Sequence, residues 1–167
     1  ETIAPINAEV DSSPPIVELE PPSYPIYDNY SIFKNIVFID TAVSQYEIFY
    51  NSVNEYTLPI LYNRLTDATK INEFLFSTFT NIDRISFVFH GIKCSSTAPS
   101  TIFIENKELF LDSDLDPTTT EYSENVVFIK NLITGLNVKN VDYLGCNLLQ
   151  FTNWKTYFEI IGKDTTA

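Results

Sequence analysis

From Asn35 onward, short apolar runs alternate along the chain with segments whose apolar residues recur at helical spacing. Four runs predict strands, at residues 36–39, 57–62, 85–89 and 138–144. Four amphipathic segments predict helices, at residues 43–53, 67–79, 120–134 and 153–161. Strands that alternate with helices in this way are typical of βαβ units, so the pattern predicts an α/β fold, a three-layer α/β/α sandwich with a mostly parallel sheet.

Local signals mark several boundaries of these predicted elements. Asp67 lies at the start of the second predicted helix, where its carboxylate can cap the first turn. Gly135 follows the third helix and is a natural stop. Between the third strand and that helix, residues 102–104 and 109–111 predict a small antiparallel hairpin, although the turn between them lacks glycine.

The first 30 residues differ in composition from the rest of the chain. They hold six prolines and six acidic residues with no basic residue, which predicts an extended arm or linker over 1–30 before an α/β domain over 31–167. Two interpretations of this arm remain open, a solvated spacer and a segment that lies along a neighbouring protein chain. In the second, the contacts would come from apolar residues: Ile16, Val17, Leu19, Tyr24, Ile26 and Tyr27.

Composition and charge narrow the class of protein. Hydrophobic residues make up 44% and charged residues 19% of the chain, as expected for a folded domain. The net charge is −12 and the ten Lys and Arg are scattered, so nucleic acid is excluded as a partner. No apolar run approaches the roughly 18 residues of a membrane span. Because the sequence begins at Glu1 and contains no Met, we expect a product trimmed from a longer precursor.

Two reactive side chains directly follow the third and fourth predicted strands. His90 follows residues 85–89, and Cys146 follows residues 138–144 after one glycine. Because the carboxyl ends of parallel strands meet at one edge of a sheet, neighbouring strands would bring the two together. An imidazole can take the proton of a thiol and so produce a nucleophile, and His90 is the only histidine. The backbone N–H groups of Gly91 and Cys146 are candidate donors to an oxyanion.

The segments Phe-Val-Phe-His-Gly at 87–91 and Val-Asp-Tyr-Leu-Gly-Cys-Asn at 141–147 together resemble the two strand-to-loop junctions of the caspase, gingipain, legumain and separase clan. The first strand, which ends in Ile39-Asp40, agrees with this resemblance. Within the clan, the chain is most similar to an uncharacterised caspase-like domain near the amino ends of very large bacterial surface proteins. The resemblance covers about residues 35–167.

This resemblance implies a Cys-His dyad that acts on peptides. His90 would be the general base or acid, Cys146 the nucleophile, and Gly91 with Cys146 the oxyanion donors. No cofactor is expected. The clan's sheet usually continues past the helix after the cysteine with one or two further strands, and residues 163–167 would only begin them. The C-terminal strands are therefore expected to be missing from this sequence.

Other roles for the same residues remain open. His90 can instead make a structural hydrogen bond at its strand end, and Cys146 can be a buried, unreactive thiol. Cys94 lies four residues beyond His90, so a disulfide between Cys94 and Cys146 would block the nucleophile. We expect Cys94 to be an ordinary loop residue.

An acidic segment has part of the spacing of a calcium loop. Asp112, Asp114 and Asp116 alternate with other residues, but Pro117 follows and neither the glycine nor the distal glutamate of such a loop is present. The two cysteines show no CxxC or His-rich spacing. We therefore expect a solvated acidic loop at 112–116 and no metal site.

Two functional hypotheses follow from the sequence. The first is a caspase-like cysteine peptidase domain that cuts a peptide substrate or its own precursor. The alternative is a catalytically silent assembly module of a large surface protein or a virus particle, with residues 1–30 bound to a neighbouring protein chain. The sequence leaves the compartment open, and these hypotheses favour an extracellular or cell-surface location or a virion over the cytoplasm.

Overall fold

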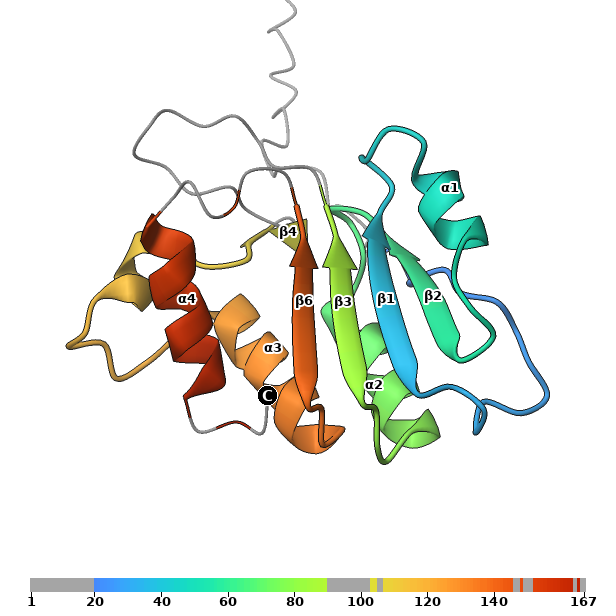
Figure 1. The fold of residues 1–167 in the computed structure, drawn as a ribbon. Helices are drawn as coiled ribbons and strands as arrows, with labels where there is room; N and C mark the ends of the chain where they lie inside the picture. Colours follow the sequence, from blue (N-terminus) through green and yellow to red (C-terminus); the bar gives the residue numbers. More distant parts are fainter. Residues whose placement is uncertain are drawn as a thin grey trace, which may run out of the picture.

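A four-stranded, all-parallel sheet is the centre of the fold (Figure 1). The computed structural model describes residues 20–89, 103–104, 107–145, 148, 152–163 and 165. Within these residues the sheet has the strand order β2-β1-β3-β6. The strands are β1 (Asn35–Asp40), β2 (Thr57–Tyr62), β3 (Arg84–Val88) and β6 (Asn140–Leu144). The predicted α/β class and the parallel sheet are confirmed.

Helices lie on both faces of this sheet. One face is covered by α2 (Ala68–Thr78), α3 (Glu124–Gly135) and α4 (Thr152–Gly162), and the other by the short α1 (Tyr46–Asn51). The alternation of side chains along a strand explains the two cores, because Ile36 and Phe38 point to the three helices while Val37 and Ile39 point to α1. The result is the predicted three-layer arrangement.

Stacked aromatic rings connect the strands on the face covered by three helices. Phe38, Phe87 and Tyr143 occupy matching positions on β1, β3 and β6, and their ring centroids are 5.1 Å and 5.5 Å apart. Trp154 and Tyr157 of α4 continue this cluster and are fully buried. Because such rings bury large apolar areas at fixed spacings, they hold α4 against β6, the last strand in the sheet order.

The predicted helix boundaries are confirmed at α2 and revised at α1 and α3. The Asp67 carboxylate caps α2 by accepting from the backbone N–H groups of Thr69 and Lys70, at 2.8 Å and 3.4 Å. Helix α1 is shorter than the predicted 43–53 because Gln45 adopts a left-handed φ of 60° at its start. After α3 the left-handed residue is Asn137, with φ of 50°, and not Gly135, which is the last helical residue.

The predicted hairpin is present, but its second strand begins earlier than expected. Strands β4 (Phe103–Ile104) and β5 (Lys107–Glu108) pair antiparallel as a separate two-stranded sheet. Leu109 and Phe110, which the sequence pattern predicts in the second strand, are instead fully buried in the main core. Successive side chains of a strand point to opposite faces, so the burial of both in one core agrees with a strand that ends at Glu108.

Part of the predicted arm packs against the domain itself. Ser23 forms an antiparallel bridge with Leu61 of β2, and the Tyr24 ring stacks on Phe74 of α2 with centroids 3.9 Å apart. This extended segment covers part of the outer edge of β2, which otherwise would offer unpaired backbone groups. Residues 1–19, which include Ile16, Val17 and Leu19, lie outside the described residues. In the described part of the chain, no helix is long and apolar enough to cross a membrane.

Candidate active site

The carboxyl ends of β3 and β6 lie side by side, as the dyad hypothesis requires. The two strands pair in parallel with Val88 opposite Leu144, and the backbone N–H of Phe89 donates to the carbonyl of Leu144 at 3.4 Å. The next residue after Phe89 is His90, and two residues after Leu144 comes Cys146. His90 and Cys146 themselves lie outside the described residues, as do Gly91 and Cys94.

Gly145 lies unusually close to the ring of Phe89 at this edge. A Cβ atom on Gly145 would be 2.6 Å from the Cε2 and Cζ atoms of Phe89 and 3.1 Å from Cδ2 of Leu148. Gly145 has no positive φ, so close approach and not backbone conformation requires glycine here. Phe89 is buried and stacks on Trp154 at 5.8 Å. Phe89 and Gly145, the first residues after β3 and β6, are therefore packed directly against each other.

Two further polar side chains lie at the same edge, at the ends of β1 and β2. The Asp40 carboxylate accepts from the backbone N–H of Ala42 at 2.8 Å, which holds the turn after β1. The buried Tyr62 hydroxyl has no hydrogen-bond partner in the structure of the described residues. Burial raises the pKa of Tyr62 well above its ordinary value, and the negative charge of Asp40 adds to this effect. The edge thus combines a carboxylate with a neutral phenol.

Sequence reasoning did not single out Asp40 or Tyr62 as site residues. Asp40 carries the same signal as His90, a polar residue that directly ends an apolar strand. Tyr62 has no such signal, because a tyrosine at the end of an apolar run is usual in a buried strand. Only the parallel pairing of Asp40 with Tyr62 shows that both lie at the edge where β3 and β6 end.

Ser86, the single polar residue in the third predicted strand, takes part in a hydrogen-bonded cluster with β6. Ser86 donates its hydroxyl to Oδ2 of Asp142 on β6 at 3.0 Å, and Nη1 of Arg84 lies 2.7 Å from both carboxylate oxygens of Asp142. This half-exposed cluster links β3 to β6 on the face that carries α1. Its hydrogen bonds are made within the cluster, and we assign it no part in the chemistry.

The acidic loop is structural at its centre and not wholly solvated as predicted. Asp114, in the 3₁₀ turn η1 (Asp112–Leu115), is buried, and its carboxylate accepts three hydrogen bonds. The donors are the backbone N–H groups of Leu111 and Ser123, both at 2.6 Å, and the Ser123 hydroxyl at 2.7 Å. Asp114 therefore ties this turn to the start of α3. Within the described residues, no group of three or more His, Cys, Asp or Glu is arranged to hold a metal ion.

No family model matches the chain, and no curated protein or solved structure matches it either. Evidence about function therefore comes from the residues and from the geometry of the sheet edge.

Proposed function

We propose that the chain is a caspase-like thiol peptidase domain in which Cys146 is the nucleophile and His90 the general base. The observation that supports this proposal is the direct parallel pairing of β3 with β6, with Val88 opposite Leu144. Neighbouring strands lie about 4.8 Å apart, so chain segments that leave them at one edge start from adjacent positions. The separation of 56 positions between His90 and Cys146 in the sequence then presents no obstacle to a dyad.

The proposed chemistry is acyl transfer to sulfur. His90 takes the proton of the Cys146 thiol, and the thiolate adds to the carbonyl carbon of a peptide bond. The backbone N–H groups of Gly91 and Cys146 donate to the oxygen that becomes negative. The proton passes from His90 to the leaving amine, and water then hydrolyses the thioester with His90 again acting as base.

Asp40 is the described carboxylate best located to assist such a histidine. Strand β1 lies on the other side of β3, with Ile39 opposite Val88, so Asp40 ends its strand beside the β3 junction. A nearby negative charge stabilises an imidazolium and would raise the fraction of thiolate. We infer that Asp40 positions or stabilises His90 without contacting the substrate.

A thiol-labelling experiment tests the dyad in this chain. With iodoacetamide in excess, under pseudo-first-order conditions at pH 7, Cys146 is expected to be alkylated at a higher rate than a free cysteine. His90→Ala is expected to remove this difference in rate. Asp40→Asn should slow the reaction less than His90→Ala does. Cys94→Ala is the matched control and should leave the fast phase intact. Labelling of Cys146 at the rate of free cysteine would refute the proposal.

The self-processing part of the proposal needs the longer precursor. We expect the precursor to be cut when it is expressed with Cys94→Ala and to stay uncut with Cys146→Ala. Equal processing of the two variants would show that another peptidase makes the cut, while the labelling result above would still decide whether the dyad is active.

A catalytically silent assembly module is the second candidate function. It is favoured by α1, which has no buried residue and exposes Ile48 and Phe49 to 58% and 44%. Exposed apolar side chains of this kind are common where a protein meets a partner. If Cys146 labels slowly and Ile48→Ser with Phe49→Ser abolishes assembly of the precursor, this candidate replaces the peptidase.

A further inference from the structure

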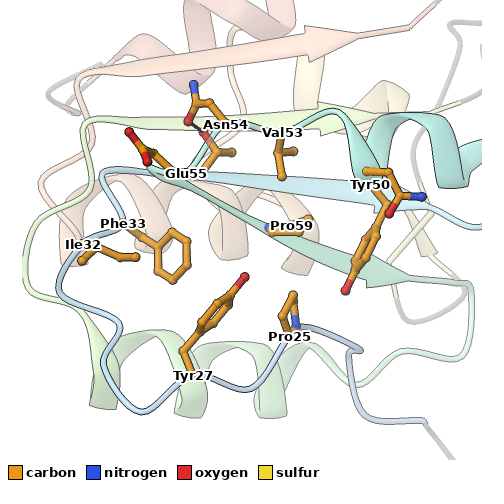
Figure 2. Close-up of a pocket in the computed structure, with 11 residues that line it drawn as sticks. Pro25, Tyr27, Ile32, Phe33, Tyr50, Val53, Asn54, Glu55 and Pro59 are labelled. Atoms are coloured by element: carbon orange, nitrogen blue, oxygen red, sulfur yellow. Dashed lines mark hydrogen bonds between the residues drawn. The ribbon is translucent and has the colours of Figure 1, made fainter.

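A groove of about 380 Å³ lies beside the amino-terminal half of β2, away from the strand ends that carry the candidate active site (Figure 2). One wall is formed by residues 25–33, which lead into β1, and the other by residues 50–55 at the end of α1 and after it. Thr57 and Pro59 of β2 line it between these walls. The groove is open to solvent and has the size of small-ligand and peptide sites.

Aromatic rings and prolines form the inner surface of this groove. Figure 2 shows the rings of Tyr27 and Tyr50 directed into it from the two walls, with Pro25 and Pro59 between them. Neither tyrosine hydroxyl makes a hydrogen bond within the described part of the chain. Partial burial raises the pKa of Tyr50, and the nearby Tyr27 adds to the shift, which agrees with two hydroxyls facing one space. The groove thus offers flat apolar surfaces and unused phenol donors.

An asparagine at one end of the groove is held in place by its neighbours. The Oδ1 atom of Asn54 already accepts from the backbone N–H of Tyr56 at 3.0 Å and from the Thr57 hydroxyl at 2.9 Å. These two bonds assign the oxygen and hold the side chain, and Figure 2 shows the amide nitrogen of Asn54 directed away from Tyr27 and Pro25. Asn51 also lines the groove and carries a second amide.

Charge and exposure at the rim of the groove indicate the sign of the charge that a ligand would carry. Among the described side chains that line the groove, only Glu55 is charged, and the whole chain has a net charge of −12. The rim and its neighbours expose large apolar side chains, with Ile26 at 91% and Ile32 at 47%. A basic group beside an apolar ligand therefore fits better than an acidic one.

We propose that this groove binds an extended, proline-containing peptide segment of a partner protein that carries a Lys or Arg. A polyproline II segment has no internal hydrogen bonds, so its carbonyl oxygens need donors such as the hydroxyls of Tyr27 and Tyr50. Its pyrrolidine rings pack on aromatic rings and prolines, and its basic residue pairs with Glu55. Residues 1–19 of the chain have acids and no base, so they fit this groove poorly.

The test measures binding of a fluorescein-labelled peptide, Ala-Pro-Leu-Pro-Pro-Leu-Pro-Arg, to the full chain by fluorescence anisotropy. The chain carries Cys146→Ala so that the result does not depend on the proposed peptidase. Tyr27→Phe and Tyr50→Phe are each expected to weaken binding about two- to tenfold, as for loss of one hydrogen bond. Glu55→Gln should weaken it about threefold and reduce its dependence on salt.

Matched variants and peptides complete the experiment. Tyr56→Phe and Glu47→Gln, which change residues that do not line the groove, should leave the affinity unchanged. A peptide with Glu in place of Arg should bind several-fold more weakly, and one with Ser in place of every Pro should not bind at about 1 mM. Unchanged circular dichroism spectra show that each variant is folded.

Three outcomes would overturn the proposal. The first is no binding of the Arg peptide at about 1 mM, or equal binding of the Ser peptide. The second is a dimer in analytical ultracentrifugation that Tyr50→Phe dissociates, which would assign the groove to a second copy of the chain. The third is tighter peptide binding when Pro14 and Pro15 are changed to Ala, which would assign it to the chain's own amino-terminal segment.

Discussion

Gly145 connects β6 to the candidate nucleophile, and its contact with Phe89 can be tested by the single substitution Gly145→Ala. The added Cβ would lie 2.6 Å from two ring atoms of Phe89, well inside contact distance. The Phe89 ring is buried and stacks on Trp154, so it has no free space into which to move. The substitution therefore forces the two junctions of the proposed site apart.

The size of the effect follows from this crowding. Inserting one methyl group into a packed core costs about 1–3 kcal/mol. Alanine also lowers the entropy of the unfolded chain. Where the native φ is compatible, as it is at Gly145, this stabilises the folded protein by about 0.4–1 kcal/mol and offsets part of the cost. The expected net loss is about 1–2 kcal/mol in the free energy of unfolding, or roughly 2–8 °C in Tm for a chain of this size.

Urea unfolding followed by tryptophan fluorescence is a suitable assay. Trp154 is the only tryptophan in the chain and stacks on Phe89, so its emission reports directly on the perturbed cluster. In a Phe89→Leu background the two clashing ring atoms are gone, and Gly145→Ala is expected to cost much less. The coupling between the two substitutions should exceed about 0.5 kcal/mol.

Gly135→Ala provides a matched control. A Cβ on Gly135 would lie 2.7 Å from Cε1 of Phe76, nearly the same clash, but the Phe76 ring is 43% exposed and can swing into solvent. Alanine is also the better residue at the end of α3, so this variant should be neutral or more stable. If Gly145→Ala is as stable as Gly135→Ala, with unchanged Trp154 emission, the close packing of the β3 and β6 junctions is refuted.

Tyr62→Phe removes a buried hydroxyl that has no partner within the described structure, so urea unfolding should show no loss of stability and a gain of up to about 1 kcal/mol. A clear loss would show that the hydroxyl is bonded. Asp114→Ala leaves three donors without their acceptor and should cost about 2–4 kcal/mol, whereas Asp112→Ala, at an exposed site, should cost less than about 0.5 kcal/mol. Burial raises the pKa of Tyr143 and Tyr157, so above about pH 10 the unfolded chain loses protons that the folded protein keeps. The contribution of these two tyrosines to stability should thus be constant below about pH 10. Above about pH 10 it should fall by about 1.4 kcal/mol per pH unit for each buried tyrosine, and Tyr157→Phe should reduce this slope.

Local patterns in the sequence were sufficient to predict the fold class. Each of the four apolar runs became a strand of the parallel sheet, because β-branched and aromatic residues at successive positions fill both of its faces. The Asp67 cap could also be predicted from the sequence, because the carboxylate and the two N–H groups that donate to it lie within three residues of each other. The predicted length of α1 was wrong because the turn at Gln45 interrupts a periodic apolar pattern.

Contacts between distant residues decided the rest. That β3 pairs with β6, that Asp114 is a buried acceptor for Ser123, and that residues 23–24 lie on β2 and α2 all depend on which elements become neighbours. The groove between Tyr27 and Tyr50 is of the same kind, since its two walls come from separate segments. Periodicity records whether a position faces a core, but not which partner fills that core, because many sequences can pack there equally well. The sequence alone was thus enough to predict the helices and strands and to propose the dyad. Only the packing of these helices and strands determined which residues share one end of the sheet or one groove.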